Sequence, residues 1–384
     1  MKALASLLFS LLAGCAGVVP VAPMPPVADL FHDASFASPA VPIDPAAALA
    51  PSDAMRDYLA SQFGSHTRST DRRRRLVDAL NRGELRLEYD SAMTRTAAQA
   101  FAARSGNCLA LVLMTASLAK ELGLAVGYQA VLGEQAWDRT DDLDIAIGHV
   151  NLVLDERREP FDRSRLTAGA MVVDFLPPRD ARRLVTRPIE ERTVVAMYLN
   201  NRAVESLAQG QIDDAYGWAR EALRTDPDML GAYLTLGVVY RARHLPQAAE
   251  QVLRRVLARE PDHLLALSNL ALLLHDLGRT DEAAALTQRL ATLDPEPPFS
   301  HFRAGLAAFR EGRFEDARRL FAKEVARAPG RPEFEYWLAR SHLALNEPTR
   351  AAVHLTRAMA ASTTRKERDL YAAKLDWLKA LPSP

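Results

Sequence analysis

The hydrophobic positions of this chain follow three patterns in succession. A nearly unbroken apolar run occupies residues 109–122 and ends at Gly123, which predicts a fully buried helix of about four turns. Beyond this run, β-branched and aromatic residues predict three strands, at 125–132, 145–154 and 170–176. From about residue 189 onward the period is helical. The patterns therefore predict an α+β domain over residues 51–185 and an all-α domain after it.

The all-α half is internally repeated. Its prolines at Pro227, Pro261, Pro295 and Pro329 are separated by 34 residues each, which is the period of tetratricopeptide (TPR) repeats. Small residues stand in the same register, where two antiparallel helices must approach closely, at Ala215, Ala249, Ala283 and Ala317. We therefore predict an all-α TPR solenoid of about five repeats over residues 190–364, followed by a C-terminal capping helix at 365–384.

A solenoid of this kind has a concave surface that binds an extended peptide or another protein. We expect a protein or peptide partner on that surface. The candidate partner-binding residues lie on the predicted inner helices and are Asn200, Asn201, Tyr233, Tyr240, Asn269, His301 and Arg303. For each of these residues, the alternative to partner binding is ordinary packing within the repeats or simple exposure to solvent. The histidines of the repeats show no metal-ligand spacing with carboxylates or cysteines, so we expect no metal site and no cofactor.

Cys108 occupies the first turn of the predicted buried helix. The residues before it, Ser105, Gly106 and Asn107, are typical of turns and helix N-caps. Unsatisfied N–H groups at a helix N-terminus favour the thiolate, which is the reactive form of cysteine. A nucleophile is one interpretation of Cys108. The other is a small hydrophobic core residue, which is a common role of unpaired cysteine.

Two polar residues fall among apolar neighbours on the predicted strands. His149 shares a strand face with Ile147 and Val153, and Asp174 shares one with Val172. An unpaired polar side chain in such surroundings costs several kcal/mol, and an imidazole that faces a carboxylate removes this cost for both groups. Such a carboxylate also fixes the tautomer of a catalytic histidine. A hydrogen-bonded pair in the core would have the same pattern.

Together these motifs resemble the transglutaminase-like superfamily of cysteine enzymes, whose site is a papain-like Cys-His-Asp triad. Gly106-Asn107-Cys108 stands at the head of the buried helix, Gly148-His149 lies on a later strand, and Val173-Asp174 lies on the strand after that. The resemblance covers about residues 84 to 180. It implies an α+β transglutaminase-like (cysteine proteinase-like) fold for the first domain.

The resemblance also implies a role for each residue. Cys108 would attack an acyl carbon, His149 would carry the proton, and Asp174 would orient the histidine. Asn107 and Gln129 are candidate oxyanion donors, with a helix cap and a solvent-facing strand residue as their respective alternatives. The implied activity is that of a thiol-dependent acyl hydrolase or transferase on amide or peptide bonds. The alternative is a non-catalytic TPR scaffold or pseudoenzyme, because related subfamilies with helical repeats have lost the cysteine.

The N-terminus has the pattern of an export signal. A lysine and a short apolar stretch precede Leu12-Ala13-Gly14-Cys15, which resembles the bacterial lipobox. We expect a lipoprotein signal peptide at residues 1–14 and lipidation of Cys15, with an ordinary secretory signal as the alternative. Ala16 in place of aspartate implies, by the same resemblance, the periplasmic face of the bacterial outer membrane. The Pro- and Ala-rich residues 15–50 are expected to form a tether.

Composition bears on the remaining classes of partner. Lys plus Arg equals Asp plus Glu at 48 each, so the net charge of the chain is zero. Because the chain has no overall positive charge to attract a nucleic acid, we expect no nucleic-acid partner. The chain has 2 cysteines, so acylation of Cys15 would leave Cys108 as the one free thiol. The aspartates between residues 134 and 144 lack the glycine and glutamate of a calcium-binding loop and predict a solvated loop.

Overall fold

The computed structural model describes most of the chain from residue 24 onward. The described residues are 24–63, 72–82, 85, 87–90, 93–132, 136–140, 143–147, 149–155, 170–175, 185–295, 299–362 and 365–379. The expected signal peptide and Cys15 lie outside these ranges, so their roles stay predictions. No helix in the described ranges is long and apolar enough to cross a membrane.

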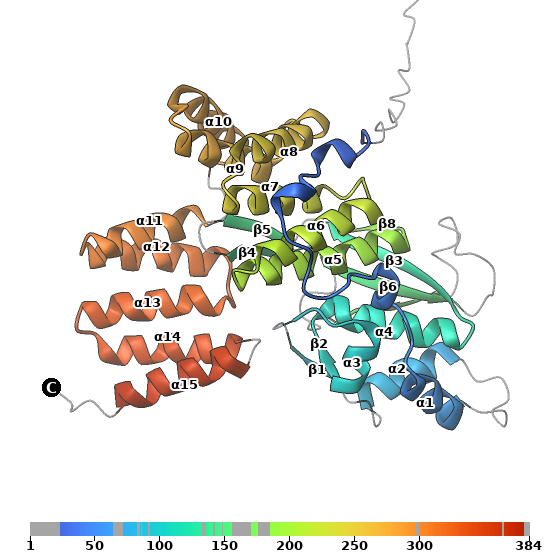
Figure 1. Ribbon diagram of the computed structural model, residues 1–384. Helices are drawn as coiled ribbons and strands as arrows, with labels where there is room; N and C mark the ends of the chain where they lie inside the picture. Colours follow the sequence, from blue (N-terminus) through green and yellow to red (C-terminus); the bar gives the residue numbers. More distant parts are fainter. Residues whose placement is uncertain are drawn as a thin grey trace, which may run out of the picture.

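The first part of the chain is an antiparallel sheet with a buried helix packed against it (Figure 1). Helix α4, Cys108–Glu121, lies against β3 and β6, and every residue from Leu109 to Ala119 is buried, as the apolar run predicts. The sheet has the order β7-β6-β3-β8, with strands β3 Ala125–Leu132, β6 Val150–Asp155, β7 Met171–Val173 and β8 Val185–Ile189.

Three shorter helices and a small strand pair complete this part. The helices are α1 Asp53–Phe63, α2 Arg72–Arg82 and α3 Ala97–Ala103. Strand β1, Glu88–Tyr89, pairs in parallel with β2, Ser105–Gly106, directly before α4. This pairing fixes the turn from which the buried helix starts.

The structure differs from the predicted elements at two places between residues 134 and 154. The strand expected at 145–154 is divided into β5, Leu143–Ile147, and β6, so that His149 lies just before β6. The loop expected at 134–144 contains strand β4, Ala136–Thr140, which pairs with β5 in antiparallel register. Strand β4 has the sequence Ala-Trp-Asp-Arg-Thr, which does not alternate between apolar and polar residues, so a period of two does not reveal it.

The second part of the chain consists of successive helix hairpins and a last single helix. The helices are α5 Glu191–Ala208, α6 Ile212–Thr225, α7 Leu230–Ala242, α8 Pro246–Arg259, α9 Leu264–Asp276, α10 Thr280–Leu293, α11 Ser300–Arg310, α12 Phe314–Arg327, α13 Pro332–Ala344, α14 Pro348–Ala361 and α15 Arg365–Lys379.

Small residues allow the helices of a hairpin to approach closely. A Cβ atom added to Gly305 would lie 2.6 Å from the Phe321 ring, and one added to Gly237 would lie 3.3 Å from Leu253. The alanines in the repeat register behave in the same way, since Ala215 and Ala317 are fully buried. The 34-residue spacing therefore reflects a repeated helix–helix contact.

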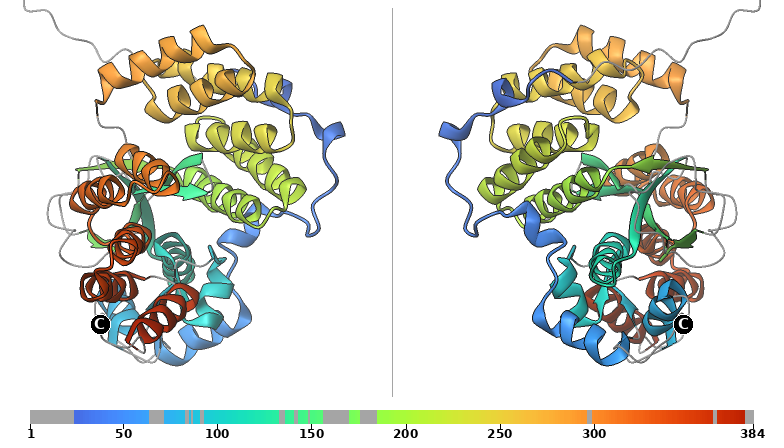
Figure 2. Two further views of the ribbon diagram at one scale, coloured as in Figure 1. Left: turned by 90° about the vertical axis from the view of Figure 1, so that its left-hand side faces the viewer. Right: turned by 90° about the vertical axis from the view of Figure 1, so that its right-hand side faces the viewer.

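The helices form two stacks (Figures 1 and 2). The buried side chains of α5 to α10 belong to the same hydrophobic cluster as the sheet and α4. Those of α11 to α15 form two further clusters, and α10 and α11 share few contacts within the described residues. The first three hairpins are thus continuous with the α+β part, whereas the later helices pack mainly among themselves.

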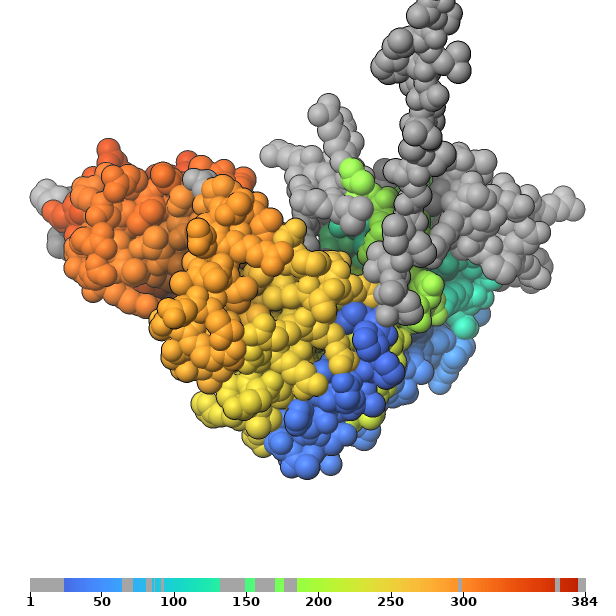
Figure 3. All heavy atoms as spheres, turned by 90° about the horizontal axis from the view of Figure 1, so that it is seen from above, coloured from blue at the N-terminus to red at the C-terminus, as the bar shows by residue number. Residues whose placement is uncertain are grey.

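Residues 24–50, called here the strap, run along the first hairpins. The strap contains the short helices η1 Ala28–Leu30, η2 Asp33–Ser35 and η3 Pro45–Ala48. Leu30 is fully buried, and its carbonyl accepts a hydrogen bond of 2.5 Å from the Tyr240 hydroxyl. The Phe36 ring stacks on Tyr216 with centroids 3.9 Å apart. Figure 3 shows the strap lying on the repeats.

The strap differs from the tether that composition predicts. A Cβ atom on Gly217 would lie 2.4 Å from Pro39, so the strap approaches the backbone of α6 directly. Asp29 pairs with Arg255 at 2.5 Å, and Asp33 accepts hydrogen bonds from Tyr216 and Arg220. Prolines stiffen this segment, but its apolar and acidic side chains attach it to the repeats.

Candidate functional site

The predicted triad residues occupy three neighbouring element ends. Cys108 is the first residue of α4 and is a half-buried free thiol. His149 directly precedes β6, and Asp174 directly follows β7. Because β6 and β7 pair with Leu152 opposite Val173, their adjoining ends bring the imidazole and the carboxylate together. His149 Nε2 lies 2.9 Å from Asp174 Oδ1.

The surroundings of His149 favour its protonated form. Burial lowers the pKa of this histidine, but hydrogen bonds to Asp174 and to Cys108, together with their negative charges, raise it to about 9. The Asp174 carboxylate, 2.9 Å from Nε2, holds one edge of the ring, and Cys108 is near enough for its sulfur to raise the pKa of His149. The His149–Asp174 pair is the part of a nucleophile, base and orienter set that the hydrogen bonds show directly.

Asn107 acts as the cap of helix α4. Its side-chain carbonyl accepts from the backbone N–H of Ala110 at 2.9 Å, and its amide nitrogen donates to Thr94 Oγ1 at 2.7 Å. Both ends of the side chain are therefore engaged. These contacts show that Asn107 caps the helix. Its proposed role as an oxyanion donor stays a prediction.

Gln129 is buried, so the interpretation of it as a strand residue that faces solvent is wrong. It is 7% exposed, and the register of β3 and β6 places it opposite Asn151. Asn151 is 3% exposed; its amide nitrogen lies 3.5 Å from Asp174 Oδ2, and its Oδ1 has no hydrogen-bond partner among the described residues. Two buried amides thus lie opposite one another beside Asp174, and the oxyanion role of Gln129 stays a prediction.

Tyr89 is a neighbour of Cys108 that the sequence did not indicate. Burial and the negative charge of a Cys108 thiolate raise the pKa of the Tyr89 hydroxyl to about 12, although 47% of the residue is exposed. Tyr89 pairs with Gly106 across β1 and β2.

The first helix hairpin contributes to the frame of the site. Asn201 on α5 donates to Thr94 Oγ1 at 3.3 Å, and Glu205 accepts from the Thr94 backbone N–H at 2.6 Å. Burial raises the pKa of Glu205, while its bonds to Thr94 and Arg202 oppose that change. Thr94 also accepts from Asn107, so a chain of hydrogen bonds joins α5 to the N-cap of α4.

Most of the predicted partner-binding residues are not on an open surface. Tyr233 and Tyr240 are fully buried, and their hydroxyls donate to Pro227 O at 2.8 Å and to Leu30 O; the expectation of surface positions is wrong for both. Asn201 is engaged by Thr94. The remaining candidates are buried or half-buried: Asn200 is 4% and Asn269 5% exposed, and His301 and Arg303 are half-buried.

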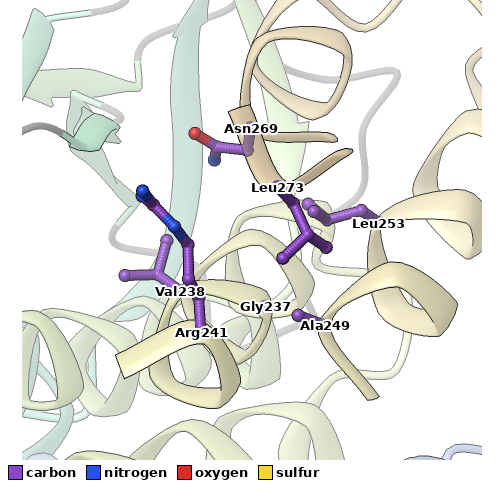
Figure 4. A pocket seen from close by; sticks show the side chains of 7 residues that line it. All are labelled: Gly237, Val238, Arg241, Ala249, Leu253, Asn269 and Leu273. Atoms are coloured by element: carbon purple, nitrogen blue, oxygen red, sulfur yellow. The ribbon is translucent and has the colours of Figure 1, made fainter. Parts of the chain in front are cut away.

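A small cavity lies between α7, α8 and α9 (Figure 4). It is lined by Gly237, Val238, Arg241, Ala249, Leu253, Asn269 and Leu273, and its volume is about 10 Å³. Arg241 pairs with Asp276 at 2.7 Å, and the Asn269 amide nitrogen has no hydrogen-bond partner among the described residues. A cavity of this size has room for about one water molecule. It is therefore not a ligand site.

No group of three or more histidine, cysteine, aspartate or glutamate side chains suited to a metal ion occurs in the described ranges. The expected absence of a metal and of a cofactor is not tested by this observation.

Comparison with known proteins places the helical half in the class of helical repeat proteins. The family model of the tetratricopeptide repeat matches residues 234–298 and 302–364. These residues therefore carry tetratricopeptide repeats, as the 34-residue spacing predicts for them. The α5–α6 hairpin lies before the matched residues and has the same helix-hairpin form.

A TPR repeat-containing protein of Pseudomonas aeruginosa is 31% identical to this chain over 120 residues, which are 31% of this chain and 20% of that protein. The match thus spans a fifth of that relative. Among solved structures, a thermophilic TPR protein of Thermus thermophilus is 20% identical, covers 47% of this chain and 98% of its own, and gives a TM-score of 0.34.

Two further solved structures resemble the chain at a similar level. PilF of Pseudomonas aeruginosa is 21% identical, with 49% of this chain and 94% of its own covered and a TM-score of 0.29. YrrB, described as a TPR protein with an unusual peptide-binding site, is 21% identical, with 47% and 92% covered and a TM-score of 0.25.

Proposed function

We propose that this protein is an interaction protein whose tetratricopeptide repeats bind a protein or peptide partner. The observation that supports this proposal is the repeated helix hairpin of residues 234–298 and 302–364. Stacked hairpins of this class present an extended surface on which main-chain and side-chain groups of a peptide are recognised. In this account the α+β part is the frame on which the first repeats are built.

The test is direct binding between purified proteins. The full chain retains candidate partners from a bacterial envelope extract, and each candidate is then purified and titrated against the chain in solution. Saturable binding that is unchanged by Cys108→Ala supports the proposal, because Cys108 lies on α4 and not on a repeat. A chain that binds none of the purified candidates saturably contradicts it.

A second candidate function is thiol-dependent acyl chemistry by a transglutaminase-like domain. The contact of 2.9 Å between His149 Nε2 and Asp174 Oδ1 supports it, as does the position of Cys108 at the N-terminus of α4, near enough to His149 to raise the pKa of that histidine. The Cys108 thiolate would attack the acyl carbon of an amide to form a thioester, and the imidazolium would protonate the departing amine. Water or a second amine would then release the acyl group and return the thiol.

Alkylation of the native protein tests this second function. If the triad is assembled, iodoacetamide modifies Cys108 at pH 7 faster than it modifies free cysteine, as followed by mass spectrometry of the Cys108 peptide. His149→Gln removes the proton acceptor and is expected to slow the reaction by at least about tenfold. Modification that requires denaturation contradicts a catalytic role and leaves the scaffold function in place.

For the N-terminus we propose a lipid anchor on Cys15 that holds the protein at the periplasmic face of the outer membrane. The lipobox pattern of Leu12-Ala13-Gly14-Cys15 supports this proposal. Growth with an alkyne-tagged fatty acid should label the wild-type protein and not Cys15→Ser. Equal labelling of both proteins, or of neither, contradicts the anchor.

A further inference from the structure

A groove opens near the end of the repeat array, between α13 and α15. Its volume is about 530 Å³, which falls within the range of ligand pockets, roughly 300–1,000 Å³. Buried Leu355 of α14 contributes to its lining. At its edge, Leu370 and Trp377 of α15 are 49% and 58% exposed, so large apolar side chains face solvent. This groove, called here the C-terminal groove, is absent from the sequence-based candidates.

The residues that line the C-terminal groove form two matched sets. Tyr336, Arg340 and Leu343 lie on α13. Leu370, Lys374 and Trp377 lie on α15, each 34 residues later than its counterpart. Because one repeat is 34 residues long, the equal offset means that both sets occupy the same face of successive first helices. Helix α15 therefore extends the binding face of the array as well as covering its end.

Two cations of the groove are held over aromatic rings. The Arg340 guanidinium lies 4.3 Å from the Trp337 ring centroid, and the Lys374 ammonium lies 5.2 Å from that of Tyr336. Within the described part of the chain neither cation pairs with a carboxylate. Arg241 on the inner helix α7, by contrast, pairs with Asp276. The groove thus combines apolar surface with positive charge that the described residues do not neutralise.

Parts of the first three repeats are engaged within the chain. Strand β5 lies alongside α7 and α9, and Asn201 of α5 donates to Thr94. The strap covers part of α6, α7 and α8. Figure 3 shows the later helices standing at one side of the molecule, apart from the strap. A partner that needs a free face would therefore meet the C-terminal groove first.

We propose that the C-terminal groove binds an extended acidic segment of a partner protein, in which a carboxylate adjoins a large apolar side chain. The carboxylate contacts Arg340 and Lys374, and the apolar side chain packs on Trp377 and Leu370. Charge complementarity selects this occupant, because a neutral apolar segment would leave both cations without a counter-charge, and a basic one would be repelled. The inference rests on the proposed function, since it names the site and the class of the partner.

The probe is a fluorescein-labelled nonapeptide of alternating glutamate and leucine with both ends blocked, followed by fluorescence anisotropy. A glutamine–leucine peptide with a free C-terminal carboxylate is the second probe, and it separates a terminal from a side-chain carboxylate. We expect Arg340→Glu and Lys374→Glu each to weaken binding of the preferred probe by at least about tenfold. Trp377→Ala is expected to weaken it as well, because it removes the apolar contact.

Arg357→Glu is the matched control. Arg357 is exposed on α14 and outside the groove, so it has the same charge change and should alter the dissociation constant by less than about twofold. Circular dichroism confirms that each variant is folded, and Lys374→Met, which removes charge without reversing it, separates loss of attraction from repulsion. With Lys374→Met, binding is expected to fall between that of the wild type and that of Lys374→Glu.

Several results would overturn the proposal. One is binding of neither probe, and another is equal weakening by Arg357→Glu and Lys374→Glu, which would mean unspecific attraction. Self-association of the chain that Trp377→Ala abolishes would make the groove an interface between copies. A purified partner that binds wild type and Lys374→Glu equally would exclude this groove but leave the proposed function intact, whereas absence of any partner would contradict that function itself.

Discussion

The pKa of His149 gives a quantitative prediction about Asp174→Asn. Folding raises the pKa of this histidine from 6.5 to about 9, so between these values the folded protein holds a proton that the unfolded chain has released. The difference between a pKa of 6.5 and one of about 9 corresponds to about 3 kcal/mol of stability, because a tenfold change in proton affinity is worth roughly 1.36 kcal/mol. This stabilisation is fully present below about pH 6.5 and is lost as the pH rises through about 9.

Asp174→Asn removes the carboxylate that holds the imidazolium. Burial of His149 then dominates and lowers its pKa, so the variant should lose much of this pH dependence. Urea unfolding at pH 6 and pH 9.5 measures the difference. The wild type is expected to lose up to about 3 kcal/mol more than the variant between these two pH values.

An NMR titration of the imidazole protons gives the same quantity independently. The His149 signal is identified by its absence in His149→Gln. A wild-type pKa at or below 6.5 would refute the reasoning, because the hydrogen bonds to Asp174 and Cys108 would then not compensate for burial.

Two further predictions concern packing. Gly305→Ala should destabilise the protein by about 1–3 kcal/mol in urea unfolding, because the new Cβ would lie 2.6 Å from the Phe321 ring. The control is Gly231→Ala, whose new Cβ would have its nearest contact at 3.6 Å and which should have little effect or be slightly stabilising. Equal losses of stability in the two variants would contradict the close approach of the helices at Gly305. Leu30→Ala should lower the free energy of unfolding by about 2–5 kcal/mol and increase hydrogen exchange in the strap, because Leu30 is fully buried. The control is Val41→Ala, which should lower it by less than about 0.5 kcal/mol, because Val41 is 66% exposed. Unchanged hydrogen exchange in Leu30→Ala would show that the strap does not depend on this anchor.

Periodicity predicted the parts of the fold that depend on contacts between near neighbours. The 34-residue spacing of prolines and small residues identified the repeats, because each hairpin makes the same internal contact. The apolar run after Cys108 identified the buried helix, since residues on every side of α4 are covered. The meeting of His149 with Asp174 was also expected, because buried polar groups require partners.

Contacts between distant segments were not predictable in this way. Composition gave no indication that the strap would dock, because the anchoring role of Leu30 depends on Tyr240, 210 residues away. Tyr233 and Tyr240 resemble surface aromatics of an inner helix, but they fill the core between helices. The C-terminal groove could not be predicted from the sequence. The sequence does not show that Arg340 and Lys374 lie over aromatic rings, nor that no described carboxylate pairs with them.

The central claim is that the repeats recognise a partner, and that they do so at the exposed end of the array. Site-specific photocrosslinking in living cells tests it most directly, with Trp377→p-benzoylphenylalanine in the C-terminal groove. The control is Val353→p-benzoylphenylalanine, since Val353 is 47% exposed on α14 and outside the groove. We predict a discrete crosslinked adduct from position 377 that is absent from position 353. No adduct at 377, or the same adduct from both positions, would contradict the account.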